Sequence, residues 1–373
     1  MQKLISADDH LVEPASLWQD RLPEALRGSG PRLIDTDEGS LWLIEDRRYP
    51  LPRKNEFVSG RTSAEHFGSD EHSFKQSELL PPFYDPAVRA DLMRGDGIVG
   101  SVCFPTLPRF SGTLFLELQD TELALACVRA WNDFLFEEWC GAAPDFYIPM
   151  VMIPLWDPAA AAVELERCAA LGARAVTMPE NPVPLGLPSY YDPYWDPVWR
   201  VAEEAEIAVC MHIGTSGEMP VLSPEAPFTA VIVASETNCI KCLVNLLFSP
   251  VPLRYPKLQF VLSESGLGWI PSFLERSDRE WRTHGIYEKM LPVPPSEVFR
   301  RSFYGCFVGD PVAVAVRHLI GVDRMLWESD YPHAESPVPH SQKVVADAFA
   351  GVPQDEVDLI THGNAAKLFR WST

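Results

Sequence analysis

Basic residues are scarce in this chain, and they do not cluster. The sequence has 31 lysines and arginines against 52 aspartates and glutamates, which gives a formal net charge of −21. Without a basic run the chain offers no concentrated positive charge that could bind a phosphate backbone or an anionic membrane surface. We therefore expect neither nucleic acid nor a membrane as a partner. A small anionic substrate would need local help from an arginine or a metal, because the overall field repels it.

Long apolar runs and paired cysteines are missing as well. No apolar run reaches the roughly 18 residues of a membrane span, and the start, MQKLISADDH, lacks the features of a signal peptide. Only Cys239 and Cys242 have Cys-x-x-Cys spacing, and there is no second pair to match them. We therefore expect a cytoplasmic protein whose cysteines are buried free thiols and not a zinc knuckle.

The content of hydrophobic residues is nevertheless high enough to form a large core. Of the 373 residues, 46% are hydrophobic and 11% aromatic, which argues against disorder. Although the chain is long for one domain, βα barrels with insertions routinely reach this length. We expect a single domain over 1–373.

Short β-branched runs alternate with longer helical patterns, which is typical of repeated βα units. Expected strands lie at 3–7, 98–104, 147–153, 173–178, 207–212, 258–263, 303–307 and 325–328. Expected helices lie at 120–140, 157–171, 193–206, 231–247 and 311–319. The predicted fold class is therefore α/β, a (β/α)8 TIM barrel.

The segment from about 13 to 95 interrupts this alternation. It is rich in proline and charge, and it contains a predicted hairpin that pairs 32–36 with 41–44 across the turn 37–40. We interpret it as an insertion after the first strand, on the C-terminal face of the barrel. It would serve as a lid or a subunit contact, or it is a solvated excursion.

Subunit contacts are also expected from aromatic surface. Besides the insertion, Trp139, Trp281 and Trp371 would supply contact area. The sequence therefore favours a homo-oligomer, a dimer or larger.

Several expected strands end in residues that can bind a metal or carry a proton. The first ends in Asp8 and His10, the fifth in His212, the sixth in Glu264 and the eighth in Asp330. In a βα barrel the carboxyl ends of all strands meet on one face, where active sites lie. These side chains should therefore converge.

The spacing of Asp8 and His10 has a physical basis. Residues two apart on a strand point the same way, so both side chains can enter the barrel mouth. Asp9, between them, should face outward, and its replacement should matter little.

Asp8, His10, His212 and Asp330 together offer two carboxylates and two imidazoles. This set suits one Zn²⁺, or alternatively Mn²⁺, with a position left open for water or a small-molecule substrate. The plain alternative is four polar residues that are separately satisfied at strand ends.

The segments that carry these residues resemble a known family. They are ADDHLVEP, CMHIGTSG, LSESGLGWIPSFLERSD and LWESDYPHAESPVP. In this order they resemble the metal-dependent amidohydrolase superfamily, in the branch with aminocarboxymuconate semialdehyde decarboxylase and the aromatic acid decarboxylases. The resemblance covers nearly the whole chain, and it implies Asp8, His10, His212 and Asp330 as metal ligands.

Two positions depart from the wider family. The lysine that bridges two metals in binuclear members would fall near Thr177 or Met178, and its absence there implies a single metal. Where many members carry a histidine after the sixth strand, this chain has Glu264. A second carboxylate near Asp330 could have a raised pKa and donate a proton, or it could be a satisfied polar residue.

Three further residues are weaker candidates. Glu13 would orient a loop or a metal ligand. His333, three residues after Asp330, would hydrogen-bond the substrate, and Arg109 would pair with a substrate carboxylate. The plain alternatives are a loop carboxylate, a surface histidine and a surface arginine.

Three functions stay open from the sequence. The first is metal-dependent decarboxylation of a small phenolic or unsaturated carboxylic acid, as the resemblance implies, with Asp330 or Glu264 delivering the proton. The second is hydrolysis of an amide, lactone or related bond by metal-activated water, with Asp330 as the base. The missing sixth-strand histidine favours hydrolysis slightly. The third is a noncatalytic binding protein on the same barrel, against which the intact ligand set argues.

Overall fold

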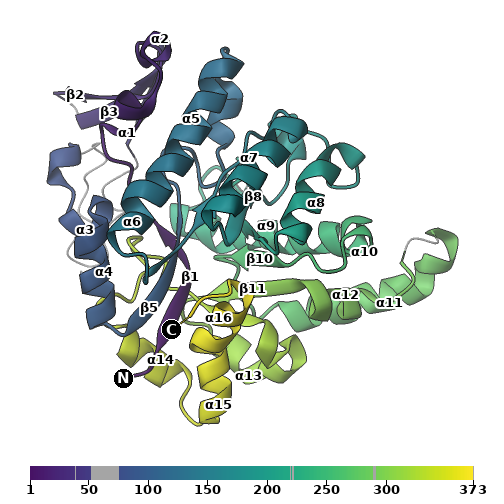
Figure 1. Ribbon diagram of the computed structural model, residues 1–373. Helices are drawn as coiled ribbons and strands as arrows, with labels where there is room; N and C mark the ends of the chain where they lie inside the picture. Colours follow the sequence, from purple (N-terminus) through teal and green to yellow (C-terminus); the bar gives the residue numbers. More distant parts are fainter. Residues whose placement is uncertain (38, 52–74, 219, 221, 289–290, 373) are drawn as a thin grey trace.

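The computed structural model describes residues 1–37, 39–51, 75–218, 220, 222–288 and 291–372. Parallel strands lie at its centre with helices outside them (Figure 1). The strands follow the order β1–β5–β6 and β7–β8–β9–β10–β11–β12, and β12 contacts β1. This is the TIM barrel that the sequence predicts. The strands are Leu4–His10 (β1), Ile98–Phe104 (β5), Tyr147–Ile148 (β6), Met150–Val151 (β7), Ala175–Pro179 (β8), Ala208–His212 (β9), Phe260–Ser263 (β10), Phe303–Phe307 (β11) and Met325–Trp327 (β12).

The third strand of the barrel is split where the sequence analysis expected one strand over 147–153. Pro149 separates β6 from β7 and has no N–H to donate to a neighbouring strand. Its carbonyl oxygen still accepts hydrogen bonds from the backbone N–H groups of Arg174 (2.9 Å) and Ala175 (3.2 Å). The break therefore leaves the barrel wall connected.

Alternating strand residues form two apolar layers. One layer fills the barrel interior, and the other packs between the strands and the surrounding helices. The interior layer includes Ile5, Ala7, Val102, Ala175, Ala208, Val261 and Leu326. Because the interior is filled, the functional groups can lie only at the ends of the strands.

A β-bulge interrupts the alternation near the end of β1. Ser6 pairs with Ser101 and Asp9 pairs with Cys103, so three residues advance on β1 against two on β5. A bulge of this kind re-aims the side chains that follow it. Ile5 and Ala7 face the interior before the bulge, and Asp8 and His10 turn toward the barrel mouth after it.

The expected helices are present, and local capping explains where they begin. Asp120 accepts hydrogen bonds from the N–H groups of Glu122 and Leu123 at the start of α5 (Thr121–Phe134), and Asp157 caps α7 (Pro158–Leu171) in the same way. Beyond α5 the helix continues through η5 (Leu135–Trp139) and α6 (Cys140–Ala142). The other helices that follow β5 are α8 (Asp196–Glu204), α9 (Phe228–Phe248), α10 (Val251–Arg254), α11 (Ile270–Glu288), α12 (Pro295–Ser302), α13 (Pro311–Ile320), α14 (Ser341–Ala348), α15 (Gln354–Asp358) and α16 (Asn364–Leu368).

The chain between β1 and β5 forms a small antiparallel sheet with short helices at one end of the barrel, and two further helices, α3 and α4, along its side (Figure 1). The predicted hairpin is present, and Leu33 pairs with Trp42 in it. A third strand, which the sequence analysis missed, continues the sheet. Residues 52–74 of the predicted insertion lie outside the described residues. The elements are α1 (Leu17–Arg21), α2 (Glu24–Arg27), β2 (Arg32–Thr36), β3 (Gly39–Ile44), β4 (Arg47–Pro50), η3 (Gln76–Glu78), α3 (Pro81–Tyr84) and α4 (Pro86–Gly95).

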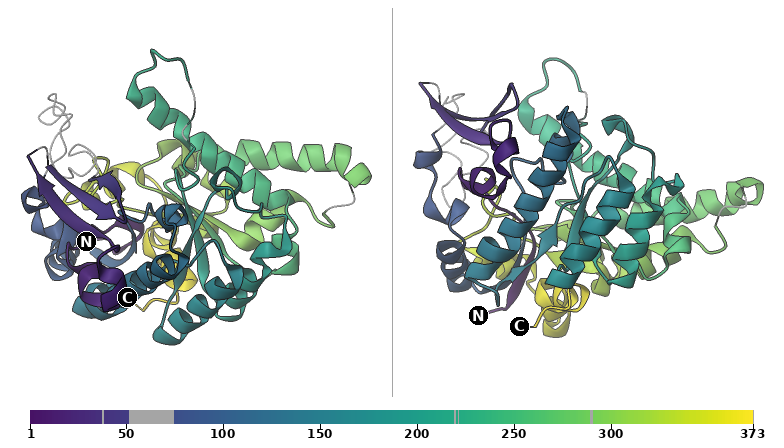
Figure 2. Two further views of the ribbon diagram at one scale, coloured as in Figure 1. Left: turned by 90° about the horizontal axis from the view of Figure 1, so that it is seen from above. Right: turned by 45° about the horizontal axis from the view of Figure 1, so that its top comes forward.

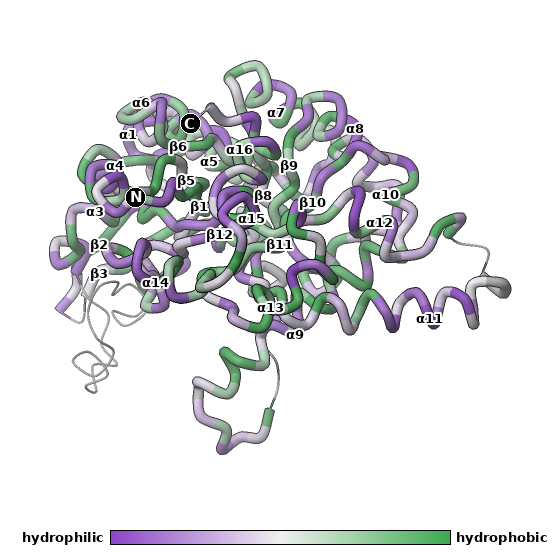
Figure 3. Tube along the Cα trace, turned by 90° about the horizontal axis from the view of Figure 1, so that it is seen from below, coloured by the Kyte–Doolittle hydropathy of each residue, from purple (hydrophilic) through white to green (hydrophobic). Residues whose placement is uncertain are grey.

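Two long helices, α9 and α11, extend beyond the barrel (Figure 2). Much of α11 is hydrophilic, as the hydropathy along the chain shows (Figure 3). Within the described residues, Thr229–Phe248 is long and apolar enough to cross a membrane by length and composition, and 39% of its apolar window is buried. One such helix is weak evidence, because buried core helices meet the same criterion.

The three tryptophans expected at the surface differ in exposure. Trp139 is fully buried and cannot supply contact surface, so this expectation was wrong. Trp281 and Trp371 are half-buried. The eight cysteines are free and buried, as predicted.

Candidate metal centre

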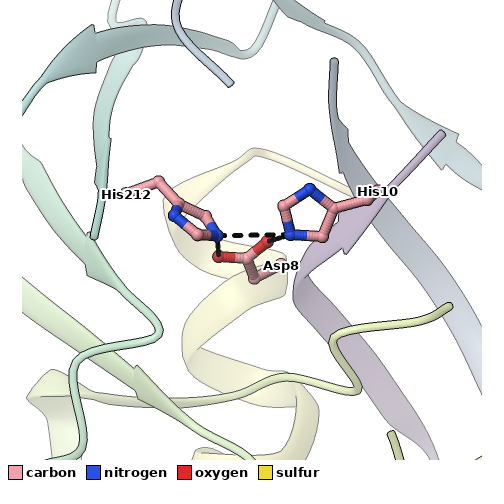
Figure 4. Close-up of side chains that lie close together, drawn as sticks. All are labelled: Asp8, His10 and His212. Atoms are coloured by element: carbon pink, nitrogen blue, oxygen red, sulfur yellow. Dashed lines mark hydrogen bonds and ion pairs between the residues drawn. The ribbon is translucent and has the colours of Figure 1, made fainter. Parts of the chain in front are cut away.

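A cluster of three side chains lies at the mouth of the barrel (Figure 4). Two of them, Asp8 and His10, come from one side of the barrel, and His212 comes from the opposite side. The bulge in β1 turns Asp8 and His10 inward, and His212 is the last residue of β9. The two Nε2 atoms are 3.2 Å apart. Asp8 lies beneath them, with Oδ1 3.5 Å from His10 Nε2 and Oδ2 3.6 Å from His212 Nε2. One ligand atom from each residue lies within 4.8 Å of the others, as a shared metal ion requires.

Asp330 joins this cluster from the loop after β12. Its Oδ1 lies 3.3 Å from His10 Nε2, and its backbone N–H donates to the carbonyl oxygen of Asp8 at 2.9 Å. Asp330 has a φ of 52°, in the left-handed region that residues other than glycine rarely adopt. This backbone conformation, held by the bond to β1, brings the fourth predicted ligand beside the other three.

The donor set fits a divalent cation. Both carboxylate oxygens of Asp8 are buried, and neither accepts a hydrogen bond from the described residues. Burial, followed by the charges of Glu328 and Asp330, raises the pKa of Asp8 well above its ordinary value. Buried acidic groups without partners are costly, and a bound cation removes that cost.

The two imidazoles are in the state that binds metal. Burial lowers the pKa of His10 well below its ordinary value, and it lowers that of His212 as well. Neutral histidine can offer a ring nitrogen as a ligand. Nδ1 of His212 lies 2.6 Å from the carbonyl oxygen of Ile213, so that nitrogen carries the proton and Nε2 is left free to bind a metal.

Glu264 and His333 complete the polar face of the mouth. Glu264 follows β10 with φ of 52°, and its Oε2 lies 3.5 Å from His212 Nε2. His333 lies between two carboxylates, with Nδ1 2.7 Å from Asp330 Oδ1 and 3.7 Å from Glu264 Oε1. Its ring centroid is 4.0 Å from that of His10. The structure therefore brings both predicted residues into the cluster.

The charges of these groups depend on one another. Burial alone would lower the pKa of His333, but the charge of Asp330 and hydrogen bonds to Asp330 and Glu264 raise it to about 10. Burial alone would raise the pKa of Glu264, but His212 and His333 lower it to about 2. Burial and the charge of Glu264 raise the pKa of Asp330, although His333 opposes them. Of the carboxyl groups beside His333, Asp330 is the one that holds a proton more readily.

Asp9 points away from the cluster, as predicted, but it is fully buried and not exposed. It accepts hydrogen bonds from the hydroxyl of Ser101 on β5 (2.5 Å), the hydroxyl of Ser329 and the backbone N–H of Tyr331 (3.0 Å). Asp9 therefore ties β1 to β5 and to the loop that carries Asp330. The expectation that its replacement matters little does not fit these contacts.

Arg109 lies in the loop after β5, and Glu13 contacts this loop. The guanidinium of Arg109 pairs with Glu117, with Nη1 2.5 Å from Oε1, and the side chain is half exposed. The structure thus does not bring Arg109 into the cluster of metal ligands. Glu13 is buried and orients this loop, since it accepts hydrogen bonds from the backbone N–H groups of Thr106 and Leu107.

Two residues of the site were missed by the sequence analysis. Phe110 lies over the ligand imidazoles, with its ring centroid 4.5 Å from that of His10 and 4.4 Å from that of His212. Arg89 is fully buried and donates from Nη1 to the carbonyl oxygen of His10 at 2.5 Å. Neither residue type marks such a role in the sequence, because both depend on how loops and helices fold back on the barrel.

Comparison with known proteins agrees with this geometry. Gamma-resorcylate decarboxylase of Polaromonas sp. (strain JS666 / ATCC BAA-500) is 26% identical over 345 residues, 82% of this chain and 97% of that protein. An amidohydrolase structure from Mycobacterium avium subsp. paratuberculosis K-10 has a TM-score of 0.77 at 23% identity and covers 99% of each chain. Dihydroxybenzoic acid decarboxylase from Polaromonas sp. JS666, with bound manganese and the inhibitor 2-nitroresorcinol, has a TM-score of 0.60 at 19% identity over 99% of this chain and 97% of that one. Residues 77–371 match the amidohydrolase family, and the chain belongs to that family.

Proposed function

We propose that this protein is a metal-dependent carboxy-lyase that removes CO2 from a small phenolic or unsaturated carboxylic acid. The observation that carries the proposal is the convergence of Asp8, His10, His212 and Asp330 at the mouth of the barrel. A relative that is similar over 82% of the chain is a decarboxylase of an aromatic acid by name. Together they favour decarboxylation over the other reactions that this ligand set could support.

Asp8, His10, His212 and Asp330 would hold one divalent ion. Zn²⁺ suits two imidazoles and two carboxylates, and Mn²⁺ is the alternative, since a structural neighbour binds manganese. When bound, the ion supplies a Lewis acid for the substrate carboxylate and a neighbouring oxygen. No lysine lies at Thr177 or Met178 on β8, which supports a single ion.

Asp330 would carry the proton of the reaction. Burial and the charge of Glu264 raise its pKa, so it can take up a proton, and the charged imidazole of His333, 2.7 Å away, can supply that proton. The bond between the ring carbon and the carboxylate breaks, and its electron pair stays on the carbon. The proton of Asp330 then bonds to that carbon as CO2 leaves. Glu264 is the alternative donor, although its lowered pKa leaves it ionised at neutral pH, without a proton to donate.

His333 would bind the substrate. Its pKa of about 10 keeps the imidazole positively charged at neutral pH, so it can donate to an anionic oxygen. Arg109 was the other candidate for this role, but its guanidinium is paired with Glu117. The local cation that an anionic substrate needs is therefore His333.

A product analysis tests the proposed function. Protein loaded with Mn²⁺ or Zn²⁺ is incubated with 2,6-dihydroxybenzoate and a panel of other phenolic and unsaturated acids, and the products are separated by chromatography. We expect at least one acid to lose its carboxyl group. Hydrolysis of an amide or lactone panel without decarboxylation of any acid would overturn the proposal.

A further inference from the structure

The loop after β5 holds an aromatic side chain in an unusual backbone conformation. Arg109 has φ of 60° and Phe110 has φ of 51°, so two consecutive residues other than glycine are left-handed. L residues rarely adopt this region, and such residues cluster at functional sites because the surrounding structure must hold them there. Surrounding contacts must therefore hold Phe110 in this conformation, and the conformation indicates a functional role.

The cause lies in contacts on both sides of the loop. The buried carboxylate of Glu13 accepts hydrogen bonds from the N–H groups of Thr106 (3.0 Å) and Leu107 (2.9 Å), which precede the left-handed pair. Trp131 Nε1 donates to the same carboxylate at 3.0 Å. On the other side, the hydroxyl of Thr177 on β8 donates to the carbonyl oxygen of Phe110 at 2.7 Å.

These contacts fix the ring of Phe110 beside the metal ligands. Its centroid lies 4.5 Å from that of His10, 4.4 Å from that of His212 and 6.1 Å from that of His333. The side chain is only half-buried, although its neighbours His10 and His212 are fully buried. The ring therefore presents apolar aromatic surface at the point where the substrate meets the ligands.

We propose that Phe110 is a specificity-determining residue, an aromatic platform that favours ring-containing acids over open-chain ones, and that Thr177 and Glu13 are positioning residues for it. This inference rests on the proposed function and narrows its substrate class to aromatic acids. Aromatic rings stack on each other in offset or edge-to-face contacts, and these stabilise a complex beyond the effect of simple burial.

Binding measurements on the metal-loaded protein test the platform. The affinity for 2,6-dihydroxybenzoate and for the open-chain acid cis,cis-muconate is measured by stopped-flow protein fluorescence, before the first turnover is complete, in wild type, Phe110→Leu and Phe136→Leu. Phe136, on η5, is a half-buried phenylalanine that packs against the outer apolar layer, whereas Phe110 packs against the interior one, and it serves as the matched control. We expect Phe110→Leu to weaken binding of the aromatic acid about three- to tenfold and to leave muconate and the metal content unchanged. Phe136→Leu should change none of these.

The positioning role has its own variant pair. Thr177→Val removes the hydroxyl that holds the Phe110 carbonyl but keeps the shape of the side chain, and Thr177→Ser keeps the hydroxyl. We expect Thr177→Val to reproduce the selectivity change of Phe110→Leu, and Thr177→Ser to restore most of the wild-type selectivity. If both variants lose selectivity equally, the hydrogen bond has no such role.

Two results would overturn the platform. One is a wild-type protein that binds muconate as well as it binds the aromatic acid. The other is a Phe110→Leu protein that loses metal and weakens both acids alike, which would make the ring only a shield for the imidazoles. Because binding is measured before the first turnover is complete, these outcomes are independent of whether the protein releases CO2.

Discussion

At the scale of single residues, we expect His212 to contribute to metal binding more than to the core. Its ring is held by the carbonyl oxygen of Ile213 and lies at the end of β9, beyond the apolar interior of the barrel. We expect His212→Ala to lower bound metal to below roughly a tenth of an equivalent, with the circular dichroism of the folded protein retained. Elemental analysis of purified protein measures the metal.

The control for this variant is His284→Ala. His284 is exposed on α11, where its Nε2 lies 3.3 Å from Oε2 of Glu280 on the same helix. Its replacement should leave the metal content at the wild-type level. A His212→Ala protein with full metal content and turnover would contradict the assignment of this ligand.

Asp330 is expected to act as both metal ligand and proton donor. Asp330→Asn keeps the shape and one coordinating oxygen but cannot donate the carboxyl proton. We expect metal binding to persist and kcat to fall by about 100-fold or more, as is usual when an acid–base group is lost. If turnover stays within about threefold of wild type, under roughly 0.7 kcal/mol on the barrier, Asp330 is only a ligand and Glu264 becomes the better donor.

Residue type and position predicted much of this site, but not its backbone geometry. Asp8, His10, His212 and Asp330 follow strands, and the ends of barrel strands converge by the nature of the fold. The left-handed conformations of Glu264, Asp330 and Phe110 depend on contacts made by distant segments. The residue types alone do not predict these conformations. Phe110 was therefore missed, although the ligands around it were predicted.

At the scale of elements, the bulge in β1 decides which side chains reach the mouth. Regular alternation would have placed Asp9 on the face of Ile5 and Ala7. The bulge reverses the faces, so Asp8 and His10 turn inward and Asp9 turns toward β5. The sequence analysis placed Asp8 and His10 on the same side, as the structure does, but it could not predict the bulge, because nothing in the local sequence marks it.

Asp9 is expected to stabilise the junction of β1, β5 and the loop after β12. Asp9→Ala removes a buried acceptor from Ser101, Ser329 and the N–H of Tyr331. Leaving such donors unsatisfied costs about 1–3 kcal/mol each, so we expect the free energy of unfolding to fall by about 2 kcal/mol or more. Denaturant titration monitored by fluorescence measures this change.

A matched comparison for Asp9 is Asp35→Ala. Asp35 lies on β2 of the small sheet, away from the barrel strands, and accepts a hydrogen bond from Ser40 at 2.5 Å. Its loss should cost less, about 1 kcal/mol. Equal unfolding curves for wild type and Asp9→Ala would show that the three contacts of Asp9 do not stabilise the fold.

The strands and helices were predicted well because each βα unit repeats the same local pattern of apolar runs, caps and turns. The expected role of Arg109 in substrate binding rested on its position after a strand, and it stays a prediction. Its partner Glu117 lies only a short way along the chain, in η4 (Thr113–Glu117), and the ion pair holds the guanidinium there. Whether a guanidinium pairs with a nearby carboxylate or with a substrate depends on the three-dimensional structure, and the sequence alone does not decide it.

At the scale of the whole molecule, we expect a homodimer or a larger homo-oligomer. The projecting helices α9 and α11 carry exposed or half-buried apolar side chains, including Ile232, Val233 and Trp281, which would be covered by a second subunit. Light scattering at micromolar concentration should give at least twice the monomer mass. A mass of 41.8 kDa would contradict the prediction.

The charge of the molecule makes the metal central to its function. A chain with a formal net charge of −21 gathers four carboxyl groups, from Asp8, Glu264, Glu328 and Asp330, around one mouth. An anionic substrate is repelled by both, and the single positive charge of His333 offsets only part of this repulsion unless a metal cation is bound as well. Metal binding should therefore be a condition for substrate binding as well as for the reaction.

The most direct test follows carboxyl-¹³C-labelled 2,6-dihydroxybenzoate, alongside other labelled phenolic acids, with metal-loaded, chelator-stripped and reloaded protein. The measured quantity is the labelled CO2 released per protein. We predict release from the loaded protein, a loss of about 100-fold or more after stripping, and recovery when Mn²⁺ or Zn²⁺ is restored. Equal release from stripped and loaded protein, or no release from loaded protein with any of these acids, would contradict a metal-dependent decarboxylase.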